Sequence, residues 1–171
     1  MTPRAVAFIG QLTAIFLIAG CAINQRATSQ NDINMRSWHG RLATQVEANP
    51  NDPQSQPQSF SASFELTGSP DVGELTFFTP LGSTAAAIRW TPRFATLEAP
   101  GDTRNFAGLS LLIQTLLGTD VPVIALFAWL DGRDMQADGW EVDLAQFAQG
   151  KITAQRRLPL PQAQLRLILE P

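Results

Sequence analysis

The stretch that decides the fold is Leu75-Thr-Phe-Phe-Thr-Pro-Leu-Gly-Ser-Thr-Ala-Ala-Ala-Ile-Arg-Trp90, two apolar runs joined by a turn. Proline fixes φ near the value that a turn requires, and Gly82, two positions after Pro80, accepts a positive φ. The stretch therefore predicts two antiparallel strands joined by a tight hairpin. Leu81 is unusual, because residues at the tip of a turn face water and are mostly polar. Two interpretations are open: Leu81 folds back onto its own hairpin, or it projects to contact a membrane or a partner.

Alternation of apolar and polar residues, which is typical of half-buried strands, recurs on both sides of this hairpin. It predicts further strands over residues 38–46, 60–66, 94–99, 103–106, 140–144, 151–157 and 163–169. Turns rich in Pro, Gly and Asn separate most of these segments, so we expect neighbouring strands to pair antiparallel. The sheet should curve, because sheets twist.

Two segments, 109–117 and 123–130, have the length and composition of helices. Gly118 is placed to end the first, and Pro122 opens the second. Both are apolar on nearly every face, so each must be covered on all sides or line something apolar. The expected fold class is α+β: a curved antiparallel sheet, forming an incomplete β-barrel, with two apolar helices that close a hydrophobic cavity.

The first 20 residues predict a lipoprotein signal peptide, with Arg4 before an apolar run too short to span a bilayer. Its end, Leu17-Ile-Ala-Gly-Cys21, resembles the lipobox of bacterial lipoproteins. This implies a diacylglycerol on the Cys21 sulfur, cleavage before it, and a third acyl chain on its amino group. The alternative is an ordinary secretory peptide with an incidental cysteine. Residues 21–35 are expected to be the acylated N-terminus and a flexible tether, and residues 36–171 a single domain.

Signals for catalysis or nucleic-acid binding are poor. The formal net charge is −3 and no basic run is present, which argues against nucleic acid as a partner. His39, the single histidine, has neither a second histidine for a metal nor a nucleophile motif beside it. Cys21 is the single cysteine, so an internal disulfide and a Cys-based metal site are both excluded. We expect no metal, no cofactor and no enzymatic activity.

The chain resembles the LolB family, the outer-membrane receptors of the lipoprotein-localisation pathway. The matching segments, which cover most of residues 38–171 in the family's order, are the lipobox Cys21, Gly40–Ala43, Pro80–Thr84, Leu117–Gly132 and Gly139–Val142.

This resemblance implies a half-barrel lipoprotein-binding domain at residues 36–171, with a hydrophobic cavity inside an incomplete barrel. The family accepts lipoproteins from the periplasmic carrier LolA and inserts them into the outer membrane without covalent chemistry. The implied partners are therefore LolA, acylated lipoprotein cargo and outer-membrane lipid, for a lipid-anchored monomer that faces the periplasm. Leu81 matches the family's exposed leucine, so Pro80, Leu81 and Gly82 are expected to form a membrane-insertion loop.

Candidate residues for the acyl-chain cavity were chosen by the face on which their segments place them. They are Phe64, Phe77, Ile88, Trp90, Leu112, Leu116, Phe127 and Trp140. An alternative function is a lipid-anchored envelope scaffold or assembly protein with a solid core and no acyl-chain cavity. A third is a periplasmic lipid hydrolase, against which the missing nucleophile motif argues.

Overall fold

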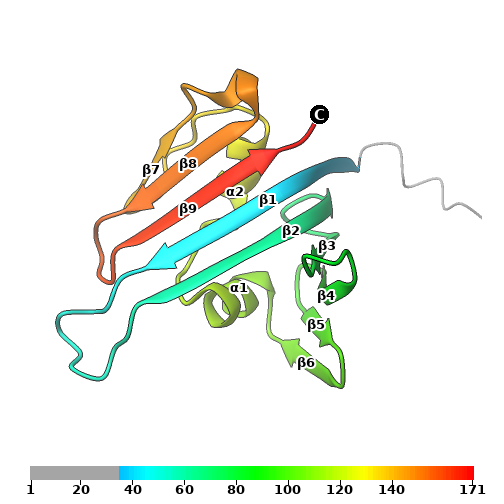
Figure 1. The fold of residues 1–171 in the computed structure, drawn as a ribbon, viewed down its shortest axis with the longest axis horizontal. Coiled ribbons are helices and arrows are strands. Elements are labelled where there is room, and N and C mark those ends of the chain that lie inside the picture. The colour runs from blue at the N-terminus through cyan, green and yellow to red at the C-terminus, as the bar shows by residue number, and fades with distance from the viewer. Residues whose placement is uncertain (1–34) are drawn as a thin grey trace, which may run out of the picture. The chain divides into compact units, whose positions relative to one another are not determined.

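Nine antiparallel strands form one open, curved sheet in the computed structural model, which describes residues 35–171 (Figure 1). Their order across the sheet is β6-β5-β4-β3-β2-β1-β9-β8-β7. The strands are β1 (Arg36–Val46), β2 (Gln58–Gly68), β3 (Gly73–Phe78), β4 (Thr84–Trp90), β5 (Ala95–Ala99), β6 (Asp102–Phe106), β7 (Trp140–Asp143), β8 (Lys151–Arg156) and β9 (Ala163–Leu169). The first six make one meander and the last three a second.

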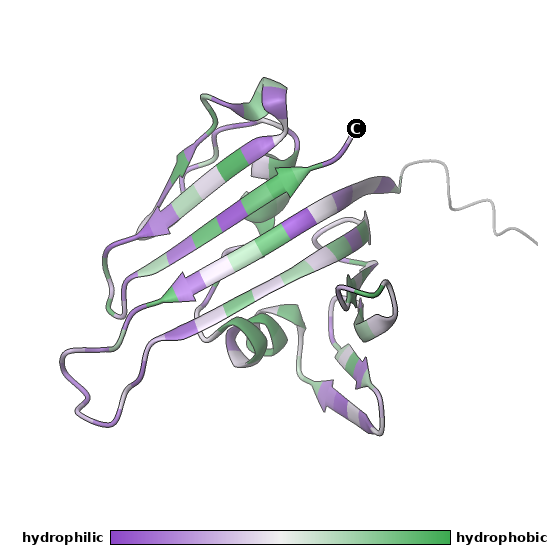
Figure 2. Ribbon diagram, viewed as in Figure 1, coloured by the Kyte–Doolittle hydropathy of each residue, from purple (hydrophilic) through white to green (hydrophobic). Residues whose placement is uncertain are grey.

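The two meanders are joined where β1 pairs with β9, from Gly40 opposite Leu169 to Val46 opposite Ala163. Along β1 and β2, inward residues such as Leu42 and Phe64 are buried, whereas outward residues such as Arg41 are exposed. Figure 2 shows this alternation as bands of opposite hydropathy along the central strands. The period-two pattern therefore predicted the buried face correctly.

Two helices, α1 (Leu109–Leu117) and α2 (Val123–Leu130), connect the meanders. Figure 1 shows α1 inside the curve of the strands from β2 to β6, and α2 behind β1 and β9. Leu112 of α1 and Trp129 of α2 are fully buried in the shared core. The outer sides of the helices are less covered than their composition suggested, because Leu111 is 50% exposed and Ile124 is 66% exposed.

Each of the chain's four tryptophans donates its indole N–H to a main-chain carbonyl. Trp38 of β1 reaches the carbonyl of Leu130 at the end of α2, at 3.2 Å. Trp140 of β7 reaches the carbonyl of Asp120 between the helices, at 3.1 Å. Large apolar rings thus fill the core while their polar atoms are satisfied, and the sheet is tied to the helical connection.

The fold class expected from the sequence is confirmed as an open, curved antiparallel sheet with two helices. A short 3-10 turn, η2 (Phe147–Gln149), was not expected. The predicted signal peptide, the acylated Cys21 and most of the tether lie outside the described residues. Within residues 35–171, none of the helices has the length and apolar character needed to cross a membrane.

Gly40 and Gly82 provide a matched test of how closely the chain is packed. Both have positive φ, but a Cβ at Gly40 would overlap the carbonyl oxygen of Ile168 in β9, whereas one at Gly82 would meet nothing within 4 Å. Gly40→Ala should therefore lower the free energy of unfolding by about 3 kcal/mol, combining backbone strain and overpacking. Gly82→Ala should lower it by about 1 kcal/mol, from strain alone.

Urea unfolding followed by tryptophan fluorescence measures both effects. Equal losses of stability in the two variants would contradict the close contact between β1 and β9.

Candidate functional site

The turn between β3 and β4 is held by three hydrogen bonds that involve Thr79. Its N–H donates to the carbonyl of Ser83 at 2.8 Å, and its own carbonyl accepts from the N–H of Gly82 at 2.9 Å. Its hydroxyl accepts from the N–H of Ser83 at 3.2 Å. The predicted hairpin is confirmed, with Pro80 and Leu81 at the two central positions of the turn.

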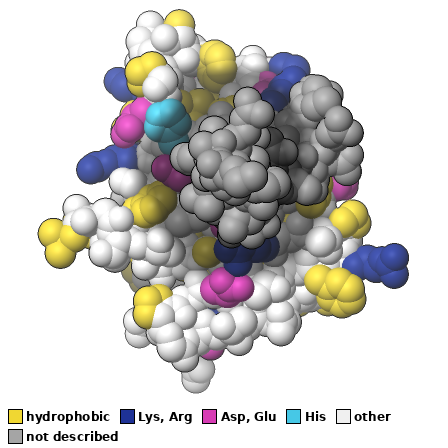
Figure 3. Space-filling model, turned by 90° about the vertical axis from the view of Figure 1, so that its right-hand side faces the viewer, with side chains coloured by type: hydrophobic (Ala, Val, Ile, Leu, Met, Phe, Trp, Pro, Cys, Tyr) yellow, Lys and Arg dark blue, Asp and Glu magenta, His cyan; other side chains and the backbone are white. Residues whose placement is uncertain are grey.

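Leu81 is 95% exposed, the most exposed large hydrophobic side chain among residues 35–171. The interpretation in which it folds back onto its own hairpin is therefore wrong, because such a leucine would be partly covered. On the face shown in Figure 3, exposed hydrophobic side chains are scattered among polar ones. Val72 and Phe94 also lie in hydrogen-bonded hairpin turns, but each closes its turn, whereas Leu81 is at a central position of its own.

An apolar pocket of about 330 Å³ lies beside this turn, between the sheet and α1. Its walls include side chains from β2, β3, β4 and α1, and the turn itself contributes to the rim. The lining residues that matter here are Phe60, Ala62, Phe77, Ala85, Ala86 and Leu116, with Thr79 and Pro80 from the turn.

A bulge in β4 lies in the wall of the pocket. Phe77 is opposite Ala86, but Phe78 is opposite Thr84, so Ala85 is an extra residue in the strand. A bulge bends the strand locally, and here it lets two adjacent small side chains line the pocket. Phe60 and Phe77, which both line the pocket, contact each other edge to face, with ring centroids 5.2 Å apart.

The proposed cavity residues divide into three groups in the structure. Phe77 and Leu116 come together in the pocket beside the turn. Trp140 lines a separate pocket of about 610 Å³ next to α2. The remaining candidates are buried in the core: Phe64, Ile88, Trp90, Leu112 and Phe127.

Several lining residues were missed by the choice of candidates, although their sequence signals were present. Phe60 lies four residues before Phe64 in β2, so the period-two pattern places both side chains on the same inward face. Ala85 and Ala86 belong to a row of alanines that is unusual in a strand, where larger β-branched and aromatic residues are favoured.

The clearest electrostatic feature of the sheet lies on the outer face of β3, β4 and β5, away from this pocket. Arg89 donates to Glu98 at 2.9 Å and to Glu74 at 3.1 Å. The hydrogen bonds to Glu98 and Glu74 raise the pKa of Arg89 above its ordinary value. The charges of Arg89, Glu74 and Glu98 are therefore accounted for by pairing between neighbouring strands. Within the described part of the chain, no group of three or more His, Cys, Asp or Glu residues could hold a metal ion.

Comparison with known proteins places these features in a family. Residues 36–171 match the family model described as outer membrane lipoprotein LolB. The chain is 30% identical over 151 residues to the outer-membrane lipoprotein LolB of Dechloromonas aromatica, covering 77% of each chain. It is 28% identical over 167 residues to the protein of the same name from Bordetella petrii, covering 84% of this chain and 81% of the relative. For that of Shewanella amazonensis, the identity is 27% over 139 residues, covering 77% of this chain and 63% of the relative. The chain therefore belongs to the LolB family of outer-membrane lipoproteins.

Proposed function

We propose that this protein is an outer-membrane receptor that accepts acylated lipoproteins from the periplasmic carrier LolA and inserts them into the outer membrane. The observation that carries the proposal is the 95% exposed Leu81 on a hydrogen-bonded turn that also forms the rim of an apolar pocket. Membership of the LolB family supports the location and the lipoprotein cargo. In this proposal the protein acts as a lipid-anchored monomer facing the periplasm, and no covalent step is involved.

The energetics of acyl chains explain why such a receptor is needed. Burying hydrocarbon contributes about 0.8 kcal/mol per CH₂, so three long chains in water would cost tens of kcal/mol. Each carrier must therefore cover the chains throughout the transfer. A transfer without an energy source runs downhill, from a carrier that holds the chains less tightly to this receptor and then to the bilayer.

The pocket must enlarge to take a full acyl chain. At roughly 30 Å³ per methylene, a volume similar to that of a water molecule in the liquid, about 330 Å³ holds roughly ten methylenes. We propose that α1 moves away from the sheet, because Gly108 and Gly118 flank it and both have positive φ. Leu112 and Ile88, now in the core, would then extend the wall that Phe77 and Leu116 begin.

Leu81 would act in delivery rather than in anchoring. Burying one leucine contributes about 1.5–3 kcal/mol, which is small beside the acyl chains expected on Cys21. A single rigid leucine can instead enter the bilayer surface next to the pocket, where the cargo leaves.

A second candidate is a lipid-anchored scaffold with a solid core. It is favoured by the burial of Phe64, Ile88 and Leu112, which are already packed in the core. A fluorescent fatty acid separates the two functions, because a scaffold without an acyl-chain cavity should not bind it.

Leu81→Glu should reduce transfer of a labelled lipoprotein from its carrier to liposomes by at least about tenfold, because a charged tip cannot enter the apolar part of the bilayer. Uptake from the carrier should persist, since Leu81 is not among the residues that line the pocket. Phe94→Glu is the control, because Phe94 is also an exposed apolar residue (66%) but lies in the turn between β4 and β5. Equal transfer by Leu81→Glu and the wild type would contradict the role of this residue.

Leu116→Glu should abolish binding of the fluorescent fatty acid and uptake from the carrier, because it places a charge in the pocket wall. Leu111→Glu is the matched control on the exposed side of the same helix. Circular dichroism should show that both variants are folded. Binding that is equally weakened in both would mean that the pocket is not the site of uptake.

A further inference from the structure

The chain enters β1 at one end of the strands β1 to β3, and Leu81 stands at the other end. Arg36, the first residue of β1, is opposite Gly68 at the end of β2, and Gly68 is opposite Gly73 at the start of β3. From Gly73, β3 runs away from this end to Phe78, and the turn that carries Leu81 follows. At about 3.3 Å per residue, β3 and the turn place Leu81 roughly 20–25 Å from the level of Arg36.

Side-chain contacts hold the start of β1 in place. Arg36 forms an ion pair with Asp131, which follows the last residue of α2. The indole N–H of Trp38 donates to the carbonyl of Leu130 at 3.2 Å, and its ring contacts that of Phe127 edge to face, with centroids 5.5 Å apart. Separating residues 36–38 from the sheet would lengthen the free chain by only about 10 Å and would break all of these contacts. The point at which the N-terminal segment leaves the domain is therefore fixed.

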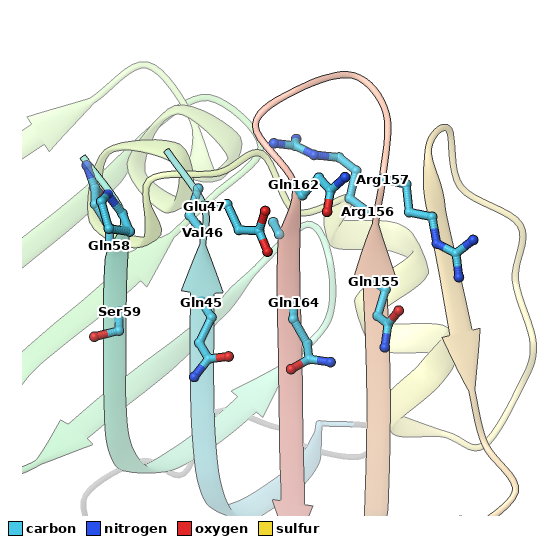
Figure 4. A pocket seen from close by; sticks show the side chains of 12 residues that line it. Gln45, Val46, Glu47, Gln58, Ser59, Gln155, Arg156, Arg157, Gln162 and Gln164 are labelled. Atoms are coloured by element: carbon cyan, nitrogen blue, oxygen red, sulfur yellow. The ribbon is translucent and has the colours of Figure 1, made fainter. Parts of the chain in front are cut away.

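The outer face of the sheet is unsuited to lie against a bilayer. On β3, β4 and β5 it carries the exposed ion pairs of Arg89 with Glu74 and Glu98. Farther along, Figure 4 shows polar side chains in register across β2, β1, β9 and β8, in the lining of a groove of about 470 Å³: Ser59, Gln45, Gln164 and Gln155. Such groups lose their hydrogen bonds to water in hydrocarbon, which costs free energy. The domain therefore meets a bilayer best with the tip of the β3–β4 hairpin leading and the start of β1 farthest away.

We propose that the domain turns over between uptake and delivery, and that the length of the segment from Cys21 to Arg36 permits this. With the start of β1 near the membrane, Leu81 and the pocket beside it point away from the membrane, toward the arriving carrier. With Leu81 at the membrane, the start of β1 is raised by roughly 20–25 Å, and residues 22–35 must span that height. This inference rests on the proposed function, in which Cys21 is acylated and Leu81 acts in delivery.

The sequence provides enough chain for both orientations. The fourteen residues 22–35 can extend to at most about 46–50 Å, which is about twice the required height. When a linker cannot span the distance between two binding sites, the effective concentration of the second site falls to near zero. A much shorter segment should therefore hold the domain in the uptake orientation and keep Leu81 from the membrane that carries the anchor.

Deletion of residues 25–33 from the full, acylated chain tests the proposal in vesicles that carry it. Residues 22–24, 34 and 35 then remain and extend to at most about 16–18 Å, less than the required height. Uptake is measured as loss of a labelled lipoprotein from its carrier. Delivery is measured as contact quenching of a dye on the cargo's acyl chain by a quencher in the bilayer core. Delivery should fall by about tenfold or more, because the linker cannot span the height, whereas uptake should be unchanged.

Two controls separate the length of the segment from its sequence and from damage to the domain. Replacing residues 25–33 by a Gly-Ser segment of equal length keeps the reach, so delivery should stay close to that of the wild type. Cys21→Ala removes the expected anchor, so with this change the shortened and full-length chains should deliver equally. Recovery of delivery by Cys21→Ala would show that the deletion acts through the anchor, because a folding defect would persist without it.

Undiminished delivery by the shortened, anchored chain would overturn the proposal. An equal loss in the Gly-Ser control, or in the shortened chain that carries Cys21→Ala, would overturn it as well, and so would a mass spectrum that shows no acyl groups on Cys21. Leu81→Glu keeps the two proposals apart. If Leu81→Glu loses delivery while the shortened chain keeps it, the inference about reach fails and the proposed function stands. Normal delivery by Leu81→Glu would instead contradict the proposed function.

Discussion

The pairing of β1 with β9 is the interaction on which the rest of the structure depends. Without it, the meander from β1 to β6 and the meander from β7 to β9 would be two separate sheets. On the inner face the pairing sets Leu42 opposite Leu167, both buried, so the core is continuous across the junction. β1 also holds the end of α2, through the hydrogen bond from Trp38 to Leu130 and the ion pair between Arg36 and Asp131. One strand therefore positions the sheet and the helical connection together.

The sequence predicted those parts of the fold that have local signals. The hairpin depends on Pro80 and Gly82, and the helix boundaries follow from Gly118 and Pro122, each of which acts on its own neighbourhood. The junction of β1 with β9 was not predicted, because alternation shows which residues face inward but not which strand lies alongside. Partners so far apart in the chain leave no local pattern.

The same limit explains the candidate site. Alternation correctly predicted that Phe64, Phe77 and Ile88 face inward, but facing inward does not distinguish a packed core from the wall of a pocket. That difference depends on the bulge that admits Ala85 and on how closely α1 approaches the sheet. The burial of Arg156 at the end of β8 was also missed. The signal was present in the sequence, because Arg156 continues the alternation that places Ile152 and Ala154 on the inward face of β8. A charge at an inward position is rare unless it has a partner.

The residues around Leu81 are explained by the geometry of the turn, but Leu81 itself is not. Pro80 and Gly82 supply the backbone angles of the turn, and Thr79 supplies its hydrogen bonds. Leu81 contributes to neither, and with 95% of its surface exposed it buries almost no apolar area that could stabilise the fold. Folding therefore gives no reason for a leucine at this position. A reason must come from outside the folded chain, and the proposed contact of Leu81 with a bilayer surface beside the apolar pocket would supply one.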